Sequence, residues 1–320
     1  MGALCGGALT GAGIYRGWIK GAKKMRDAEK TEENLREIMA REIAGNPHAE
    51  AIIGAFQPLL LARRRLLAAE KWPAVTLTGF DPARFGAGIP LLRQVQFFSA
   101  ANPWGEMTDM MAAAIGAGFP VLNRDMERIA GAARNKDIDL FSYFHKLVDA
   151  GRDENLVFSW AEKLSVSAPV LEFLLRQLSR VVLEKRLTEA AALIGDIEWR
   201  HGYCPVCGEF PSIALIEEKI TRRWLHCSGC GHEWIFSRVI CPYCEHEAQQ
   251  GMDFFYVEDR PRETAFSCDQ CRRYLVTLKG VSELADRDLD VTAMSLTHLD
   301  VIMQGKEFSP MVNTPWNALR

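Results

Sequence analysis

The chain has 320 residues, of which 48% are hydrophobic and 25% are charged, and its formal net charge is -3. This length is sufficient for two domains with apolar cores of their own. The small net charge gives no general argument for binding to nucleic acid or to an anionic membrane surface. Because the sequence contains no run of about 18 or more apolar residues, we expect no membrane insertion.

The N-terminal segment is small and weakly apolar, and several basic residues follow it. It lacks the charged start and apolar run that characterise a secretion signal. We therefore expect residues 1–27 to be a mobile leader in which Cys5 is a free thiol, and we expect the protein to be cytoplasmic. In that compartment, paired cysteines indicate metal binding rather than disulfides.

Residues 28–200 show the hydrophobic periodicity of helices. The segment from Pro169 to about Leu187 is apolar around more than half of its circumference, which predicts a central, buried helix. Pro58 predicts a kink or break in the helix that contains it, and the Pro- and Gly-rich residues 73–90 predict a long loop. The expected helices span residues 29–43, 51–69, 104–116, 120–132, 138–148, 157–164, 169–187 and 188–199. The basic run 63–65 inside the second helix is expected to lie on a solvated face.

After residue 201 the pattern changes to short strand-like segments between cysteines. Eight of the nine cysteines form four Cys-x-x-Cys pairs, a spacing that lets two thiolates point into one turn and bind the same ion. The pairs are Cys204/Cys207, Cys227/Cys230, Cys241/Cys244 and Cys268/Cys271. The segments 213–216, 223–225, 234–236, 254–257 and 274–278 are rich in aromatic and β-branched residues and predict strands.

The four pairs predict two metal ions, each with four Cys ligands. Adjacent pairing, with Cys204 to Cys230 in one site and Cys241 to Cys271 in the other, closes short hairpins. An interleaved arrangement, with the two outer pairs in one site and the two inner pairs in the other, remains open. Zinc and iron both accept four thiolates, so the metal also remains open. A closed shell of four thiolates leaves no position for substrate, and the sequence contains no phosphate loop, nucleophile elbow or zinc-protease helix. We therefore expect no catalytic residues.

Glycines and histidines next to the cysteines predict the shape of these turns. Gly208 and Gly231 directly follow a cysteine pair, where a positive φ ends the turn. Glu245 and Arg272 hold the equivalent positions in the second half, which predicts more strained turns there. With eight thiolates present, we expect the nearby histidines to lie beside the sites or at the surface rather than to bind metal. These histidines are His201, His226, His232 and His246.

In their order and flanking residues, the cysteine motifs resemble the formate dehydrogenase accessory protein FdhE family. The resemblance covers about residues 199–300 and is carried by four strings: Trp-Arg-His-Gly-Tyr-Cys-Pro-Val-Cys-Gly at 199–208, Leu-His-Cys-Ser-Gly-Cys-Gly-His-Glu-Trp at 225–234, Arg-Val-Ile-Cys-Pro-Tyr-Cys at 238–244, and Cys-Asp-Gln-Cys-Arg-Arg-Tyr-Leu at 268–275. It implies a cytoplasmic assembly factor that is not an enzyme and that binds the catalytic subunit of formate dehydrogenase before its export. It also implies rubredoxin-like modules that hold iron through the cysteine pairs.

Together these features predict an α+β, multidomain protein. A helical domain (28–200) is followed by two tandem rubredoxin-like or zinc-ribbon modules (201–238 and 239–280) and by a C-terminal helix and tail (281–320). The partner is expected to bind across the junction between the helical domain and the metal modules. Candidate contacts are Phe254, Phe255 and Tyr256, of which at least half are expected to pack in the core. The sequence does not indicate the oligomeric state.

Two other functions compete with an accessory role. A rubredoxin-like iron protein that transfers electrons or senses redox state would use the same turns. A nucleic-acid-binding zinc ribbon is disfavoured, because residues 201–280 contain nine Lys or Arg and eleven Asp or Glu, and eight thiolates with two divalent ions add further negative charge. The local exception is Arg222-Arg223-Trp224. We expect no nucleic-acid partner.

Overall fold

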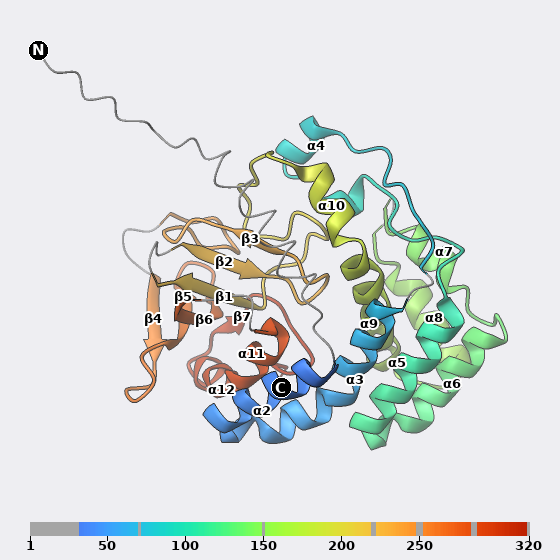
Figure 1. Ribbon diagram of the computed structural model, residues 1–320, viewed down its shortest axis with the longest axis horizontal. Helices are drawn as coiled ribbons and strands as arrows, with labels where there is room; N and C mark the ends of the chain where they lie inside the picture. The colour runs from blue at the N-terminus through green and yellow to red at the C-terminus, as the bar shows by residue number, and fades with distance from the viewer. Residues whose placement is uncertain are drawn as a thin grey trace, which may run out of the picture.

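The protein is described by a computed structural model that covers residues 32–69, 72–148, 151–218, 222–247, 252–282 and 287–318. The expected leader, with Cys5, lies outside these residues. Helices occupy one side of the molecule and a mixed β-sheet the other, with two C-terminal helices beside the sheet (Figure 1). This is the α+β architecture that the sequence predicts. None of the described helices is long and apolar enough to cross a membrane.

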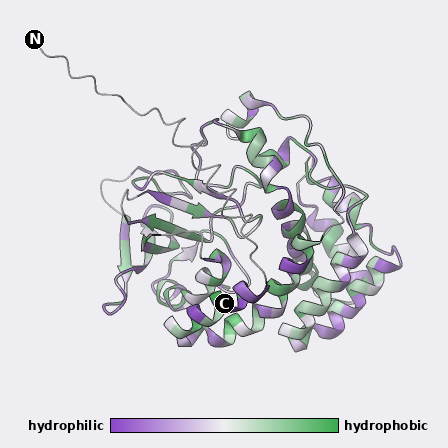
Figure 2. Cartoon of the chain, in the orientation of Figure 1, coloured by the Kyte–Doolittle hydropathy of each residue, from purple (hydrophilic) through white to green (hydrophobic). Residues whose placement is uncertain are grey.

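The helical side agrees with the expected segments to within a few residues. Its α-helices are α2 (Glu32–Gly45), α3 (Glu50–Ala68), α4 (Pro82–Gly86), α5 (Trp104–Gly118), α6 (Asn123–Arg134), α7 (Leu140–His145), α8 (Glu154–Leu164), α9 (Ala168–Lys185) and α10 (Leu187–Ile194). Helix α9 is central, as expected, and packs against α3, α5, α8 and α10. Figure 2 shows hydrophobic positions gathered on α9 and in the strands, whereas the outer helices also carry hydrophilic positions.

Aspartates begin several of these helices. The carboxylates of Asp81, Asp139 and Asp153 accept hydrogen bonds from backbone N–H groups in the first turns of α4, α7 and α8. Such caps satisfy donors that have no partner inside the helix and stabilise it by about 1 kcal/mol each. Helix α4 lies within residues 73–90, so the expected long loop is interrupted there.

Two features of α3 differ from the prediction. The helix continues through Pro58, so the predicted alternative of a break is wrong. Arg63 and Arg64 do not lie on a solvated face: their side chains are 6% and 16% exposed and pair with acidic residues, whereas that of Arg65 is 53% exposed. The acidic partners come from α9 and from the C-terminal helices, which local sequence does not reveal.

The strands form one seven-stranded sheet in the order β3-β2-β1-β6-β5-β4, with the short β7 also paired to β6. The strands are β1 (Ile213–Glu217), β2 (Arg223–His226), β3 (Glu233–Ile235), β4 (Met252–Tyr256), β5 (Glu263–Cys268), β6 (Arg273–Val281) and β7 (Ser309–Pro310). β1–β3 and β4–β6 are each antiparallel, as in two ribbons. The parallel pair β1–β6, in which Ala214 faces Thr277, joins the ribbons into one sheet. The division into units at residues 200, 238 and 280 stays a prediction.

The expected C-terminal helix is two short helices, α11 (Leu289–Ser295) and α12 (Thr297–Gly305). Helix α11 packs against α2 and α3, and α12 packs against β5 and β6. The C-terminal segment therefore connects the helical side with the sheet. Asp288 caps α11 by accepting hydrogen bonds from the N–H groups of residues 290 and 291.

Asp300 on α12 is a buried acid that holds this helix to the sheet. It is 2% exposed, and its Oδ1 accepts a 2.6 Å hydrogen bond from the Tyr274 hydroxyl on β6. Burial raises the pKa of Asp300 to about 7, although the bond from Tyr274 opposes the rise. In the unfolded chain the same carboxyl has a pKa of about 3.9. Between these values the folded state holds a proton that the unfolded state has lost, so stability falls as pH rises from about 4 to about 7.

Replacing Asp300 with Asn is expected to remove this loss. A pKa difference of about 3 corresponds to at most about 4 kcal/mol, so D300N should be more stable than the parent by up to that amount at pH 8 and by only about 1 kcal/mol at pH 4.5. Urea unfolding of both proteins at these two pH values measures the difference. An equal effect of the substitution at both pH values would contradict the assigned burial of the charge.

Candidate metal centres

The structure brings the eight paired cysteines together in two groups of four. Cys204, Cys207, Cys227 and Cys230 form centre 1, and Cys241, Cys244, Cys268 and Cys271 form centre 2. Within each group all sulfur atoms lie within 4.8 Å of one another. The grouping is the adjacent pairing, and both groups contain cysteine alone. In the described residues the cysteines are free thiols rather than disulfides.

Each centre is built from turns that present two thiols. In centre 1 the N–H of Gly208 donates to Cys204 O at 2.9 Å, and the N–H of Cys204 donates to Glu209 O at 2.8 Å. The turns that begin at Cys227 and Cys241 repeat this pair of hydrogen bonds. The N–H of Val206 also points at Cys204 Sγ, at 3.4 Å. Such N–H groups stabilise a thiolate.

The sulfur positions fit a four-thiolate ion. Zinc–sulfur bonds of about 2.3 Å in a tetrahedron place the sulfurs about 3.8 Å apart. In centre 2 the Cys241–Cys271 and Cys244–Cys268 sulfur distances are both 3.8 Å. In centre 1 the Cys204–Cys230 and Cys207–Cys227 sulfurs are 3.5 and 3.3 Å apart. Both groups have a suitable donor set, and these two distances in centre 2 equal the ideal edge length.

The expected backbone difference between the two halves is present. Gly208 and Gly231 have φ of 83° and 78°, the left-handed region in which glycine is unstrained. Glu245 and Arg272 take the same region, with φ of 56° and 55°, although each carries a Cβ. A non-glycine residue there costs about 1–2 kcal/mol. The same turn is therefore made in centre 2 at greater conformational cost.

Hydrogen bonds and burial give the thiols of each centre unequal pKa values. The pKa of Cys241 falls to about 5, mainly because Cys271 donates a hydrogen bond to it, while the same contact raises the pKa of Cys271. In centre 1 burial raises the pKa of Cys204 well above its ordinary value. Four neighbouring thiols cannot all ionise unless a cation compensates their charge, as a bound metal ion does.

Backbone and side chains of the helical side surround centre 1. The N–H groups of Leu91 and Leu92 donate to Pro205 O and Val206 O at 2.9 and 2.8 Å. From α9, Arg180 Nη1 donates to Cys227 O at 2.6 Å. Both turns of centre 1 are therefore hydrogen-bonded to residues more than 40 positions away in the chain.

A buried ionic cluster lies directly behind Arg180. Asp290 is 2% exposed and accepts hydrogen bonds from Arg63 at 2.7 Å and from Arg180 at 3.2 Å. His226 Nε2 lies 3.1 Å from Asp290 Oδ1 and donates to it when that nitrogen carries a proton. Glu184 pairs with Arg180 at 2.8 Å. This cluster joins α3, α9, α11 and β2, and the sequence analysis did not find it. The local sequence around Asp290, which lies between Leu289 and Val291 and two positions after Asp288, does not reveal its buried partners.

The four histidines lie near the cysteines but outside both groups, as expected. His226 and His232 are buried, at 4% and 7% exposure, and His232 stacks on Trp234. His201 Nδ1 lies 2.9 Å from Glu245 Oε1. His246 is exposed.

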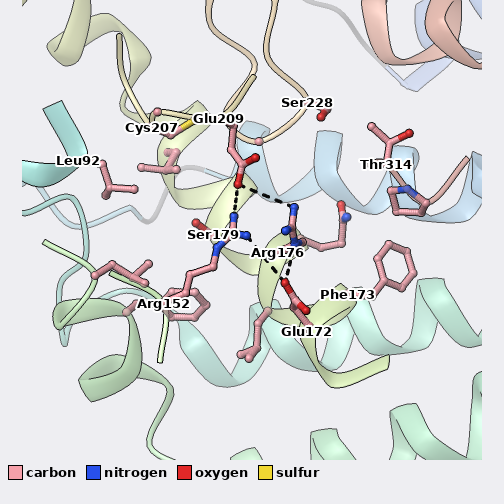
Figure 3. A pocket seen from close by; sticks show the side chains of 18 of the residues that line it. Leu92, Arg152, Glu172, Phe173, Arg176, Ser179, Cys207, Glu209, Ser228 and Thr314 are labelled. Atoms are coloured by element: carbon pink, nitrogen blue, oxygen red, sulfur yellow. Dashed lines mark hydrogen bonds and ion pairs between the residues drawn. The ribbon is translucent and has the colours of Figure 1, made fainter. Parts of the chain in front are cut away.

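A cleft of about 600 Å³ opens beside centre 1. Its walls are α9, the two turns of centre 1 and the C-terminal tail at residues 313–316. Figure 3 shows a ring of alternating charges at this place, in which Arg152 and Arg176 each pair with Glu172 and Glu209. Cys207, a partly exposed cysteine of centre 1, also lines the cleft. The helical side and the metal side therefore meet at one concave surface.

Comparison with known proteins agrees with this cysteine arrangement. The FdhE central domain matches residues 203–238, which contain all of centre 1. An FdhE homolog of Aquifex aeolicus is 31% identical over 103 residues, and FdhE of Escherichia coli O1:K1 is 37% identical over 79 residues. In these segments the chain is similar to the FdhE family. The matched segments cover 31% and 24% of this chain, and they span 36% and 25% of the two relatives' lengths.

The likeness in fold extends beyond these segments. The crystal structure of the FdhE protein from Pseudomonas aeruginosa superimposes with a TM-score of 0.51, covering 88% of this chain and 94% of that one at 19% identity. At this identity the match shows a shared fold.

Proposed function

We propose that this protein is an FdhE-type accessory factor for a formate dehydrogenase. It binds the immature catalytic subunit in the cytoplasm, before export, and performs no catalysis itself. Each of the two cysteine groups holds one ion, iron or zinc, through Cys204, Cys207, Cys227 and Cys230 and through Cys241, Cys244, Cys268 and Cys271. The observation that carries the proposal is the presence of two four-thiol groups in an FdhE-type fold.

The geometry supports a binding role over a catalytic one. When bound, an ion in a four-thiolate shell supplies folding free energy, or a one-electron couple if it is iron, but no free position for substrate. Centre 1 shapes one wall of the cleft, and helices α7 and α9 with the loop at residues 151–152 shape the other. The cleft therefore exists only while the turns of centre 1 are formed. We assign the catalytic subunit's docking site to this cleft.

Two other candidate surfaces are less suited. Of the aromatic residues on β4, Phe254 packs against Phe266 and Phe255 lies near Phe308, whereas Tyr256 is 61% exposed. Arg223, the centre of the basic cluster in the sequence, is 2% exposed and donates inward to Ile240 O at 2.6 Å. It is therefore not available to a polyanion such as nucleic acid.

Reversing a charge in the cleft is expected to weaken docking of the catalytic subunit. Arg176→Glu places three acids in the ring of Figure 3 and should lower retention of the subunit by about tenfold or more, since like charges in a binding surface cost several kcal/mol. Cys204→Ser removes a ligand of centre 1 and should abolish retention. A pull-down with the purified catalytic subunit measures both.

Arg134→Glu is the matched control. Arg134 is on α6, its side chain is 55% exposed, and it pairs with Asp109 away from the cleft. This variant should retain the subunit as the parent does. Normal retention by both Arg176→Glu and Cys204→Ser would refute the docking site, and normal retention by Cys204→Ser alone would refute its dependence on the metal.

A further inference from the structure

The two centres differ in their exposure to solvent. In centre 1, Cys204, Cys227 and Cys230 are each 0% exposed, and Cys207 is partly exposed into the cleft. In centre 2, Cys271 is partly exposed and Cys244 is exposed. Centre 2 is therefore more accessible to a ligand from solution than centre 1, through Cys244.

The two centres also differ in what holds their turns. Both turns of centre 1 are bonded to the helical side, through Leu91 and Leu92 and through Arg180. Arg180 leaves no space near the second turn, since a Cβ at Gly231 would lie 2.8 Å from its Nη2. Opening centre 1 would break backbone hydrogen bonds and uncover the buried ionic cluster.

Centre 2 is held by the sheet and by the C-terminal segment. Arg223 donates to Ile240 O, just before Cys241, and Ser309 N donates to Arg272 O at 2.9 Å. Exposed side chains add further contacts. Glu245 contacts His201, and Arg272 stacks on the Phe308 ring with its guanidinium carbon 3.8 Å from the ring centre. These two residues occupy the left-handed positions that glycine fills in centre 1. The strain in both turns favours their opening, because a residue with a Cβ relaxes when the turn is released.

We propose that centre 1 keeps its ion and that centre 2 exchanges its ion with thiolate ligands from solution or from a partner. An incoming thiolate takes the coordination position that Cys244 Sγ leaves, Cys244 departs as a thiolate and takes up a proton from water, and no electrons are transferred. This inference rests on both centres being loaded, as proposed above. Retention of the ion in centre 1 and exchange of the ion in centre 2 would be different roles for two sites that each have four Cys ligands.

Zinc release from the full chain tests this assignment. The anaerobic protein, loaded with two zinc ions, is challenged with a chromogenic zinc chelator, alone and with reduced glutathione. We expect one ion to leave at least about tenfold faster than the other, which corresponds to a barrier difference of about 1.4 kcal/mol. Glutathione should accelerate the fast phase alone. Alkylation after the fast phase, read by peptide mass spectrometry, should label Cys241, Cys244, Cys268 and Cys271 and spare the ligands of centre 1.

Cys244→Ser provides a second measurement, because it should bind one zinc ion and lack the fast phase. If the wild-type ions leave at one rate with both groups labelled together, or if the ligands of centre 1 are labelled first, the assignment is overturned while the proposed function stands. If the reduced protein binds fewer than two ions, both the assignment and the metal part of the proposed function are overturned. Zinc stoichiometry before the challenge therefore separates the two failures.

Discussion

Removing the metal ions from the reduced protein is expected to lower its midpoint of thermal unfolding by about 20 °C or more. Structural zinc sites have apparent binding free energies of about 10–16 kcal/mol, and in a chain of this size each kcal/mol shifts the midpoint by about 2–4 °C or somewhat less. The cysteines of centre 1 lie before β1 and between β2 and β3, and those of centre 2 lie between β3 and β4 and at the turn from β5 to β6, so each centre would tie together the two ends of one ribbon. Calorimetry on the anaerobically purified protein, before and after chelation with reductant present, measures the shift.

Adding back zinc to the chelated protein is the control, and it should restore the original transition. Metal analysis of the starting material should give two ions per chain. A midpoint that stays within about 2 °C after both ions are removed would contradict a structural role for the centres. Protein purified without oxygen or chelators that contains disulfides and no metal would contradict the centres themselves.

Features encoded by neighbouring residues could be predicted from the sequence. The turns need two cysteines three positions apart and a residue with positive φ after them, so Gly208 and Gly231 mark their ends. The helices follow from their periodicity, because the stripe on a segment such as α9 must be buried somewhere. The two turns that lack glycine could also be predicted, because Glu245 and Arg272 directly follow a cysteine pair, as the two glycines do.

Features that depend on contacts between distant parts of the chain could not be predicted from the sequence. Arg63 looks like one of three surface cations until Asp290, 227 positions later, is brought against it. The parallel pairing of β1 with β6 has no local signal either, because each strand would serve equally well at the edge of its own ribbon. Strands β5 and β7 were missed, and the C-terminal helix is divided at Leu296, where the chain turns from α2 toward the sheet.

The cluster around Asp290 leads to the second large effect. Asp290→Ala is expected to destabilise the protein by about 3–5 kcal/mol, because it removes one partner of a buried ion pair and leaves Arg63 and Arg180 short of compensating charge. Asp290→Asn keeps an acceptor for hydrogen bonds and should cost less than Asp290→Ala. Denaturant unfolding of the metal-loaded proteins measures both. The matched control is Asp109→Asn, whose partner Arg134 is exposed, and it should cost less than about 1 kcal/mol.

The same residue predicts how stability responds to acid. Burial alone would raise the pKa of Asp290, but Arg180, Arg63 and His226 hold it well below its ordinary value. The unfolded chain therefore binds a proton near pH 4 that the folded chain does not, and the contribution of Asp290 is complete above that pH and is lost as pH falls below it. Asp290→Asn should lose less stability than the parent between about pH 4 and pH 3. If the parent and Asp290→Asn lose stability equally as pH falls, the guanidinium groups do not hold this carboxylate ionised. The cluster would then join α3, α9 and α11 by packing alone.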